Sequence, residues 1–187
     1  MTAQSTPPKS SLEHPTFVAV RKAFADRRFR ATEFRGQSTL VVEPKDLHEV
    51  MAFLKRTGYD FLSDVGGIDY LAYPAPMPGR FAVFYILINL GSGDRFFVKT
   101  FLDPSLPTDG IANDPALVLD SVCDLWAGAE WPEREVFDMF GIRFTDHPDL
   151  RRILLWEEYP GHPLRKDYPV RGRGEREHYR IVDRSSS

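Results

Sequence analysis

The residues best suited to chemistry lie in the last third of the chain. His147 and His162 stand fifteen positions apart, and Asp149 follows the first of them. Imidazole and carboxylate groups bind zinc and act as general acids or bases. Two imidazoles without the HxxxH spacing of a helical zinc site are more typical of hydrogen bonding or interface packing. A stand-alone metal-dependent hydrolase that uses His147, Asp149 and the upstream acids is kept as an alternative hypothesis.

Three carboxylates, those of Glu133, Glu135 and Asp138, fall within a short helix predicted for residues 132–140. They project in different directions from such a helix, which argues against a catalytic acid–base set. Glu133 and Glu135 lie where the helix dipole favours negative charge. Arg134 and Asp138 are four residues apart, so we predict that they pair on one face of the helix.

The sequence offers few means of binding a redox cofactor. Cys123 is the single cysteine, so this chain alone can form neither a disulfide nor the thiolate cage of an iron–sulfur cluster. On the apolar face of a predicted helix it is interpreted as a core residue. The glycines after Val65 lack the spacing of a phosphate-binding loop. We therefore expect no catalytic, cofactor-binding or metal site in this chain.

The upstream residues predict a scaffold. Apolar residues at helical spacing predict one helix beginning at Pro15 and another beginning at Pro44 and ending near Gly58. A third helix is predicted after Asp114, with a buried stripe of Val118, Val122, Leu125 and Trp126. A fourth, the short helix of residues 132–140, should end at Gly141.

Four β-prone runs complete the scaffold. They cover residues 38–43, 59–71, 80–90 and 95–102, and the turn between the last two is short enough for an antiparallel hairpin. The order of elements predicts an α+β domain over residues 15–142, with a mixed, largely antiparallel sheet and helices packed against it. Residues 1–14 are predicted to be disordered, and residues 143–187 to form an extended C-terminal tail.

The tail differs in charge from the rest of the chain. The whole chain carries a net charge of −3, but residues 143–187 hold ten Lys/Arg against eight Asp/Glu. Four X–Pro steps bias this tail away from helix, while apolar and aromatic residues alternate with arginine as they do in protein interfaces. We predict that it binds another polypeptide. RNA binding is a weaker alternative, because the interleaved acids favour partner carboxylates.

The residues from 133 to 169 resemble the signature of a known family. Glu-Arg-Glu at 133–135 is followed by Asp138, Met139–Phe140, His147, Arg151 and Ile153–Leu154, and then by EEYPGHPLRKDYP at 157–169. More than thirty residues agree in order and spacing with the 30 kDa subunit of respiratory complex I, the proton-pumping NADH:quinone oxidoreductase. The chain is similar to the bacterial stand-alone form, which is not fused to the 49 kDa-type subunit.

The resemblance implies a structural subunit without catalysis of its own. FMN, iron–sulfur clusters and quinone would lie in partner subunits of the peripheral arm, on the cytoplasmic side of the bacterial inner membrane. The chain would brace the 49 kDa-type subunit and neighbouring Fe–S subunits, so that electrons pass from NADH to quinone. An equivalent subunit of a ferredoxin- or hydrogenase-linked membrane complex is an alternative. The family-motif residues expected to contact partners are Glu133, Arg134, Glu135, Asp138, Phe140, Gly141, His147, Asp149, Arg151, Arg152, Tyr159, His162, Arg165, Lys166 and Tyr168.

Overall fold

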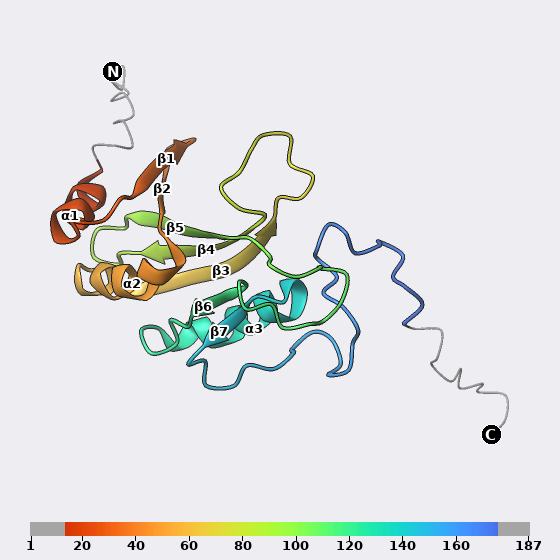
Figure 1. Cartoon of the computed structure of the whole chain (residues 1–187). Helices are drawn as coiled ribbons and strands as arrows, with labels where there is room; N and C mark the ends of the chain where they lie inside the picture. Colours follow the sequence, from red (N-terminus) through yellow and green to blue (C-terminus); the bar gives the residue numbers. More distant parts are fainter. Residues whose placement is uncertain (1–13, 176–187) are drawn as a thin grey trace, which may run out of the picture.

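The computed structural model describes residues 14–175, and the disorder predicted for residues 1–13 lies outside them (Figure 1). Its centre is a five-stranded sheet in the order β1-β2-β5-β4-β3. All neighbouring strands are antiparallel except β2 and β5, which run parallel. The strands are β1 (Arg30–Phe34), β2 (Gln37–Val41), β3 (Phe61–Asp69), β4 (Phe81–Ile88) and β5 (Arg95–Leu102). The predicted mixed sheet and the β4–β5 hairpin are confirmed, while β1 was not predicted.

Two helices cover one face of the sheet from its N-terminal side. They are α1 (Pro15–Ala23) and α2 (Leu47–Arg56), the second preceded by the 3-10 turn η2 (Pro44–Asp46). Both begin beside a proline, as predicted, because proline lacks the N–H that a first helical turn leaves unpaired. The ring of Phe17 on α1 lies 5.0 Å from that of Phe96 on β5. The apolar faces of both helices therefore join the inner face of the sheet in one core.

The helix predicted after Asp114 is wrong. Residues 118–120 form strand β6 (Val118–Asp120), which pairs in parallel with β7 (Arg143–Thr145). Hydrogen bonds with β7 satisfy the backbone of this stretch, so tertiary pairing outweighs its helical apolar spacing. Asp114 caps no helix. Its carboxylate accepts hydrogen bonds from the backbone N–H groups of Ser105, Leu106 and Ala116 and so closes a loop.

The predicted short helix is α3 (Glu130–Phe140), which follows the 3-10 turn η3 (Ala127–Ala129). It ends at Gly141, whose φ of +74° is a left-handed conformation that glycine adopts at little cost. Beyond β7, residues 146–175, here called the C-terminal segment, contain no helix or strand and pass beside α3 before standing away from the domain (Figure 1). Among residues 14–175, no helix is long and apolar enough to span a membrane.

Candidate functional site

The C-terminal segment is fixed to α3 by the carboxylate of Asp138. One oxygen, Oδ2, accepts hydrogen bonds from the backbone N–H groups of Ile153, Leu154 and Leu155 at 3.0, 2.8 and 3.0 Å. The other, Oδ1, lies 2.6 Å from the guanidinium of Arg152. Asp138 is fully buried, which alone would raise the pKa of its carboxyl. The three N–H groups and Arg152 outweigh that effect and lower the pKa, so the carboxylate stays charged.

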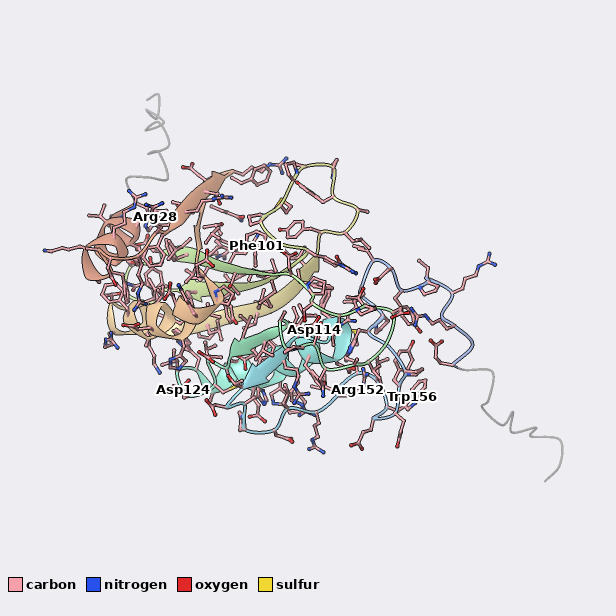
Figure 2. The ribbon with its side chains drawn as sticks, in the orientation of Figure 1. Arg28, Phe101, Asp114, Asp124, Arg152 and Trp156 are labelled. Carbon is pink, nitrogen blue, oxygen red and sulfur yellow. The ribbon has the colours of Figure 1, made fainter. Side chains whose placement is uncertain are left out.

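Two arginines cross-link the turn that Asp138 holds. Arg152 donates from Nη2 to the carbonyl oxygens of Tyr159 and Gly161 at 2.9 and 3.1 Å. Arg134 donates to the carbonyl oxygens of Arg151 and Arg152, both at 3.1 Å. The predicted pairing of Arg134 with Asp138 is therefore wrong, because each side chain turns to the C-terminal segment instead. Figure 2 shows Arg152 and Trp156 beside this segment, at the α3 end of the molecule.

The last carbonyl groups of α3, which have no partner within the helix, bind side chains of the same segment. The Nδ1–H of His162 donates to the carbonyl oxygen of Asp138 at 2.9 Å. The Nε–H of Arg165 donates to the carbonyl oxygen of Phe140 at 2.7 Å, and its Nη1 donates to that of Thr108 at 3.0 Å. His162 and Arg165 are 5% and 4% exposed. The C-terminal segment thus caps α3 with buried cationic and imidazole groups.

A second buried carboxylate, that of Glu133, joins α3 to the residues after β6. Its two oxygens accept hydrogen bonds from the Ser121 hydroxyl at 2.6 Å and from the Val122 N–H at 2.9 Å. Burial raises the pKa of Glu133, and these two hydrogen bonds partly oppose the rise. The Cys123 thiol lies 3.5 Å from the same carboxylate, and its pKa is raised to about 12 mainly by burial. Cys123 is therefore a protonated packing residue at neutral pH.

Cys123, Glu133 and His147 place one thiol, one carboxylate and one imidazole within 4.8 Å of one another. The ring nitrogens of His147 are both occupied, since Nδ1 accepts from the Asp149 N–H at 3.0 Å and Nε2 donates to the Glu130 carbonyl at 3.0 Å. A metal bound at Nε2 would require the proton to move to Nδ1 and break the bond to Asp149. Hydrogen bonding therefore accounts for His147 and Asp149.

A third anchor, formed by Asp69 and Arg80, was missed by sequence reasoning. Asp69, at the end of β3, accepts two hydrogen bonds from Arg80 and one from the Lys166 N–H at 2.8 Å. Arg80 also pairs with Asp167 at 3.0 Å. The sequence signal was a carboxylate at the end of an otherwise apolar strand pattern, but its partner lies 97 positions away. Such separation leaves no local pattern.

The family-motif residues divide by exposure. Eight are buried within the chain itself, namely Glu133, Arg134, Asp138, Phe140, Gly141, Tyr159, His162 and Arg165. Four are partly buried, namely His147, Asp149, Arg152 and Tyr168, and three are exposed, namely Glu135, Arg151 and Lys166. The buried group holds the C-terminal segment against α3. Contact of any of the fifteen with another subunit stays a prediction.

We expect the folded chain to lose stability as the pH falls from 6.5 towards 4, in part through His162. Burial, aided by the nearby Arg165 and Arg152, lowers the pKa of this histidine from 6.5 to about 4. In that window the unfolded chain binds a proton that the folded chain does not, so this contribution is complete above pH 6.5 and is lost below it. The expected loss at the acid end is on the order of 2–3 kcal/mol.

Urea unfolding of the parent chain and of His162→Asn at several pH values measures this contribution. Asparagine retains an N–H donor towards the Asp138 carbonyl but does not titrate, so the variant should show a shallower fall. Acidic groups such as Asp138 titrate in both proteins, and the difference between the two curves isolates His162. Parallel curves would contradict the assignment.

Comparisons with known proteins agree on the family. The family model described as "Respiratory-chain NADH dehydrogenase, 30 Kd subunit" matches residues 40–174. NADH-quinone oxidoreductase subunit 5 of Thermus thermophilus is 49% identical over 143 residues, which cover 72% of this chain and 63% of that protein. The corresponding NADH-quinone oxidoreductase subunit of Geobacter metallireducens is 40% identical over 164 residues, covering 87% and 93%. The match thus spans less than two thirds of the Thermus relative.

Two solved structures are similar to this one. The Nqo5 structure described as "the trypsin-resistant fragment (1-134)" superposes with a TM-score of 0.61 at 37% identity, covering 72% of this chain and 99% of the fragment. A chain of the membrane-bound sulfane sulfur reductase, an archaeal respiratory membrane complex, gives a TM-score of 0.64 at 20% identity, covering 89% and 92%. The second likeness shows the fold alone. The family model and the two relatives each cover most of the chain, which therefore belongs to the family of the 30 kDa subunit of respiratory-chain NADH dehydrogenases.

Proposed function

We propose that this chain is a structural subunit of a proton-pumping NADH:quinone oxidoreductase and performs no redox chemistry itself. The observation that supports this most is the state of the C-terminal segment, whose polar side chains are fixed internally while its large apolar ones face outward. Leu154 is 62% exposed and Leu164 49%, and Val170 is fully exposed. Apolar side chains gathered on a rigidly held segment are typical of the centre of a protein interface.

The same surface has a hollow that a partner side chain could fill. A cavity of about 640 Å³ opens among Tyr159, Leu164 and Val170. Lys166 and Arg171 border it, and neither side chain forms an ion pair with any residue of the described part of the chain. An apolar partner segment that also carries carboxylates would satisfy both features.

In this proposal the partner is the 49 kDa-type subunit, with Fe–S subunits as neighbours. FMN, iron–sulfur clusters and quinone are held by those partners, and the chain acts by keeping them in place. It would lie in the peripheral arm, on the cytoplasmic side of the inner membrane. The donor of electrons is identified by the subunits that co-purify with the chain, and a hydrogenase or a ferredoxin-binding subunit among them would favour the related membrane complexes.

Loss of assembly tests the proposal. We expect the double variant Leu164→Asp/Val170→Asp to bind fewer partner subunits by at least tenfold, because two carboxylates would be buried in an apolar interface at a cost of several kcal/mol. Co-purification with quantitative mass spectrometry measures it, and turnover per assembled complex should stay unchanged. Val18→Asp, at a 56% exposed position on α1, is the matched control.

Two outcomes would contradict the proposal. One is normal assembly of the double variant with lost turnover, which would give the segment a direct catalytic part. The other is stoichiometric metal in the purified chain that disappears in His147→Ala, which would favour the hydrolase hypothesis.

A further inference from the structure

The outer face of the sheet is more apolar than a solvated face should be. Residues on β4 alternate between the two faces, and Val83, Tyr85 and Leu87 point towards the helices and are fully buried. In an antiparallel sheet with one wet face, the intervening residues are usually polar. Here they are Phe84, Ile86 and Ile88, all partly exposed. Water is therefore an unfavourable neighbour for this face.

The apolar residues continue across neighbouring strands. Phe97 on β5 lies directly opposite Ile86, and Phe101 lies opposite Ala82, which also faces Ile68 on β3. Residues opposite each other in a sheet project to the same side, so their side chains are neighbours. We call this surface the outer stripe. Its members are Ile68, Phe84, Ile86, Ile88, Phe97 and Phe101, and none of them belongs to the buried core cluster.

The helices leave the outer stripe uncovered. Phe17 on α1 contacts Phe96, which points inward, and Phe140 at the end of α3 approaches Gly67 on the same inner side. As Figure 1 is drawn, α2 and α3 lie below the sheet and the loop of residues 70–80 rises above it. That loop covers one end of the stripe, where the Tyr70 ring lies 5.8 Å from that of Phe101.

Cations outnumber carboxylates along the stripe. Arg95 stands opposite Ile88, and Arg30 on β1 stands opposite Val41 on the same outer face. Both are exposed, and neither pairs with an acid in the part of the chain that the structure covers. Lys99 lies between them and donates to the Tyr70 hydroxyl at 3.1 Å. The acid on this face is Asp64, opposite Ile86.

We propose that the outer stripe binds a second neighbouring subunit of the same complex, through an apolar patch bordered by carboxylates. The apolar centre with cationic neighbours requires that chemistry of its partner. The stripe and the C-terminal segment lie on opposite sides of the sheet, because the segment is fixed to α3 on the inner side. A chain with both surfaces occupied links two neighbours, which is what a brace must do. This inference rests on the proposed membership of a multi-subunit complex.

Photo-crosslinking in the assembled complex tests the inference. The photoreactive residue p-benzoylphenylalanine is placed at Phe97 in the stripe, at Leu164 in the C-terminal segment, and at Val18 on α1 as the control. We expect position 97 to form an adduct with one identified subunit of the complex, position 164 with a different one, and position 18 with neither. Mass spectrometry of each adduct names the subunit.

Failure of this inference can be distinguished from failure of the proposed function. Adducts at position 164 without any at position 97 would overturn the stripe as an interface and leave the proposed function standing. An adduct at position 97 with a second copy of this chain, or with the chain's own ends, would also overturn it. Absence of adducts at both positions would overturn the proposed function as well. As an independent check, Arg95→Glu should weaken retention of the subunit that position 97 identifies at least fivefold, and unchanged retention would count against the carboxylate border.

Discussion

Asp138→Ala should lower the free energy of unfolding by about 3–5 kcal/mol and release the C-terminal segment from α3. The substitution leaves the buried guanidinium of Arg152 without its carboxylate, which lies 2.6 Å away in the parent chain. It also removes the acceptor of the N–H groups of Ile153, Leu154 and Leu155. Unpaired buried donors carry their full desolvation cost, so the loss exceeds that of an ordinary surface ion pair.

Two measurements check this result. Urea unfolding gives the change in free energy, and limited trypsin digestion should show faster cleavage after Arg151 and Arg152 once the turn opens. Glu135→Ala is the matched control, because Glu135 is an exposed carboxylate on the same helix and should change stability by no more than about 0.5 kcal/mol. If Asp138→Ala does not fold, Asp138→Asn keeps the shape and removes the charge. An effect of either Asp138 variant no larger than that of Glu135→Ala would refute the anchoring role.

The sheet was predictable because its signals are local. The runs that became β3, β4 and β5 are long, apolar and separated by turn residues, and the hairpin between the last two follows from the length of its loop. Strand β6 was not predictable in this way. Its three residues pair with β7, which begins 23 positions further on, and the stripe from Val118 to Trp126 also fits a helix. Only the tertiary pairing decides between the two.

The functional site was predictable as a set of residues but not as a geometry. Its family motif marked Asp138, Arg152 and His162, and the prolines correctly predicted that residues 146–175 lack helix and strand. The partners were misassigned, since Arg134 was paired with Asp138 by the four-residue rule for helices. That rule takes no account of a segment that returns to the helix. Buried backbone groups of the returning segment need partners, and they outcompete a surface ion pair worth a few tenths of a kcal/mol.

The buried position of these residues also changes what the motif does. A motif that contacts only a foreign subunit would have exposed side chains in the isolated chain. Here the most buried motif residues shape the C-terminal segment, and the outward apolar residues beside them, such as Leu164, are left for the partner. Internal anchoring reduces the conformational entropy that the segment would lose on binding, which strengthens the interface without adding a contact.

Gly141→Ala should lower the free energy of unfolding by about 2–5 kcal/mol, through two separate costs. The first is backbone strain, because φ at this position is +74°, a left-handed conformation that costs an L-residue about 1–2 kcal/mol. The second is a clash, because an added Cβ would lie 2.6 Å from Nε2 of His162 and would also meet the guanidinium of Arg165. Overpacking of this kind costs about 1–3 kcal/mol.

Gly36→Ala separates the two costs. Its φ of +76° gives the same backbone strain, but nothing lies within 4 Å of a Cβ built there. Urea unfolding should therefore place Gly36→Ala about 1–2 kcal/mol below the parent chain and Gly141→Ala clearly lower still. The excess loss at Gly141 measures how firmly His162 and Arg165 are held against the end of α3, because the alanine forces them away from the carbonyl oxygens of Asp138 and Phe140. Equal losses in the two variants would mean that both side chains give way freely, and the capping of α3 by the C-terminal segment would then contribute little to its position.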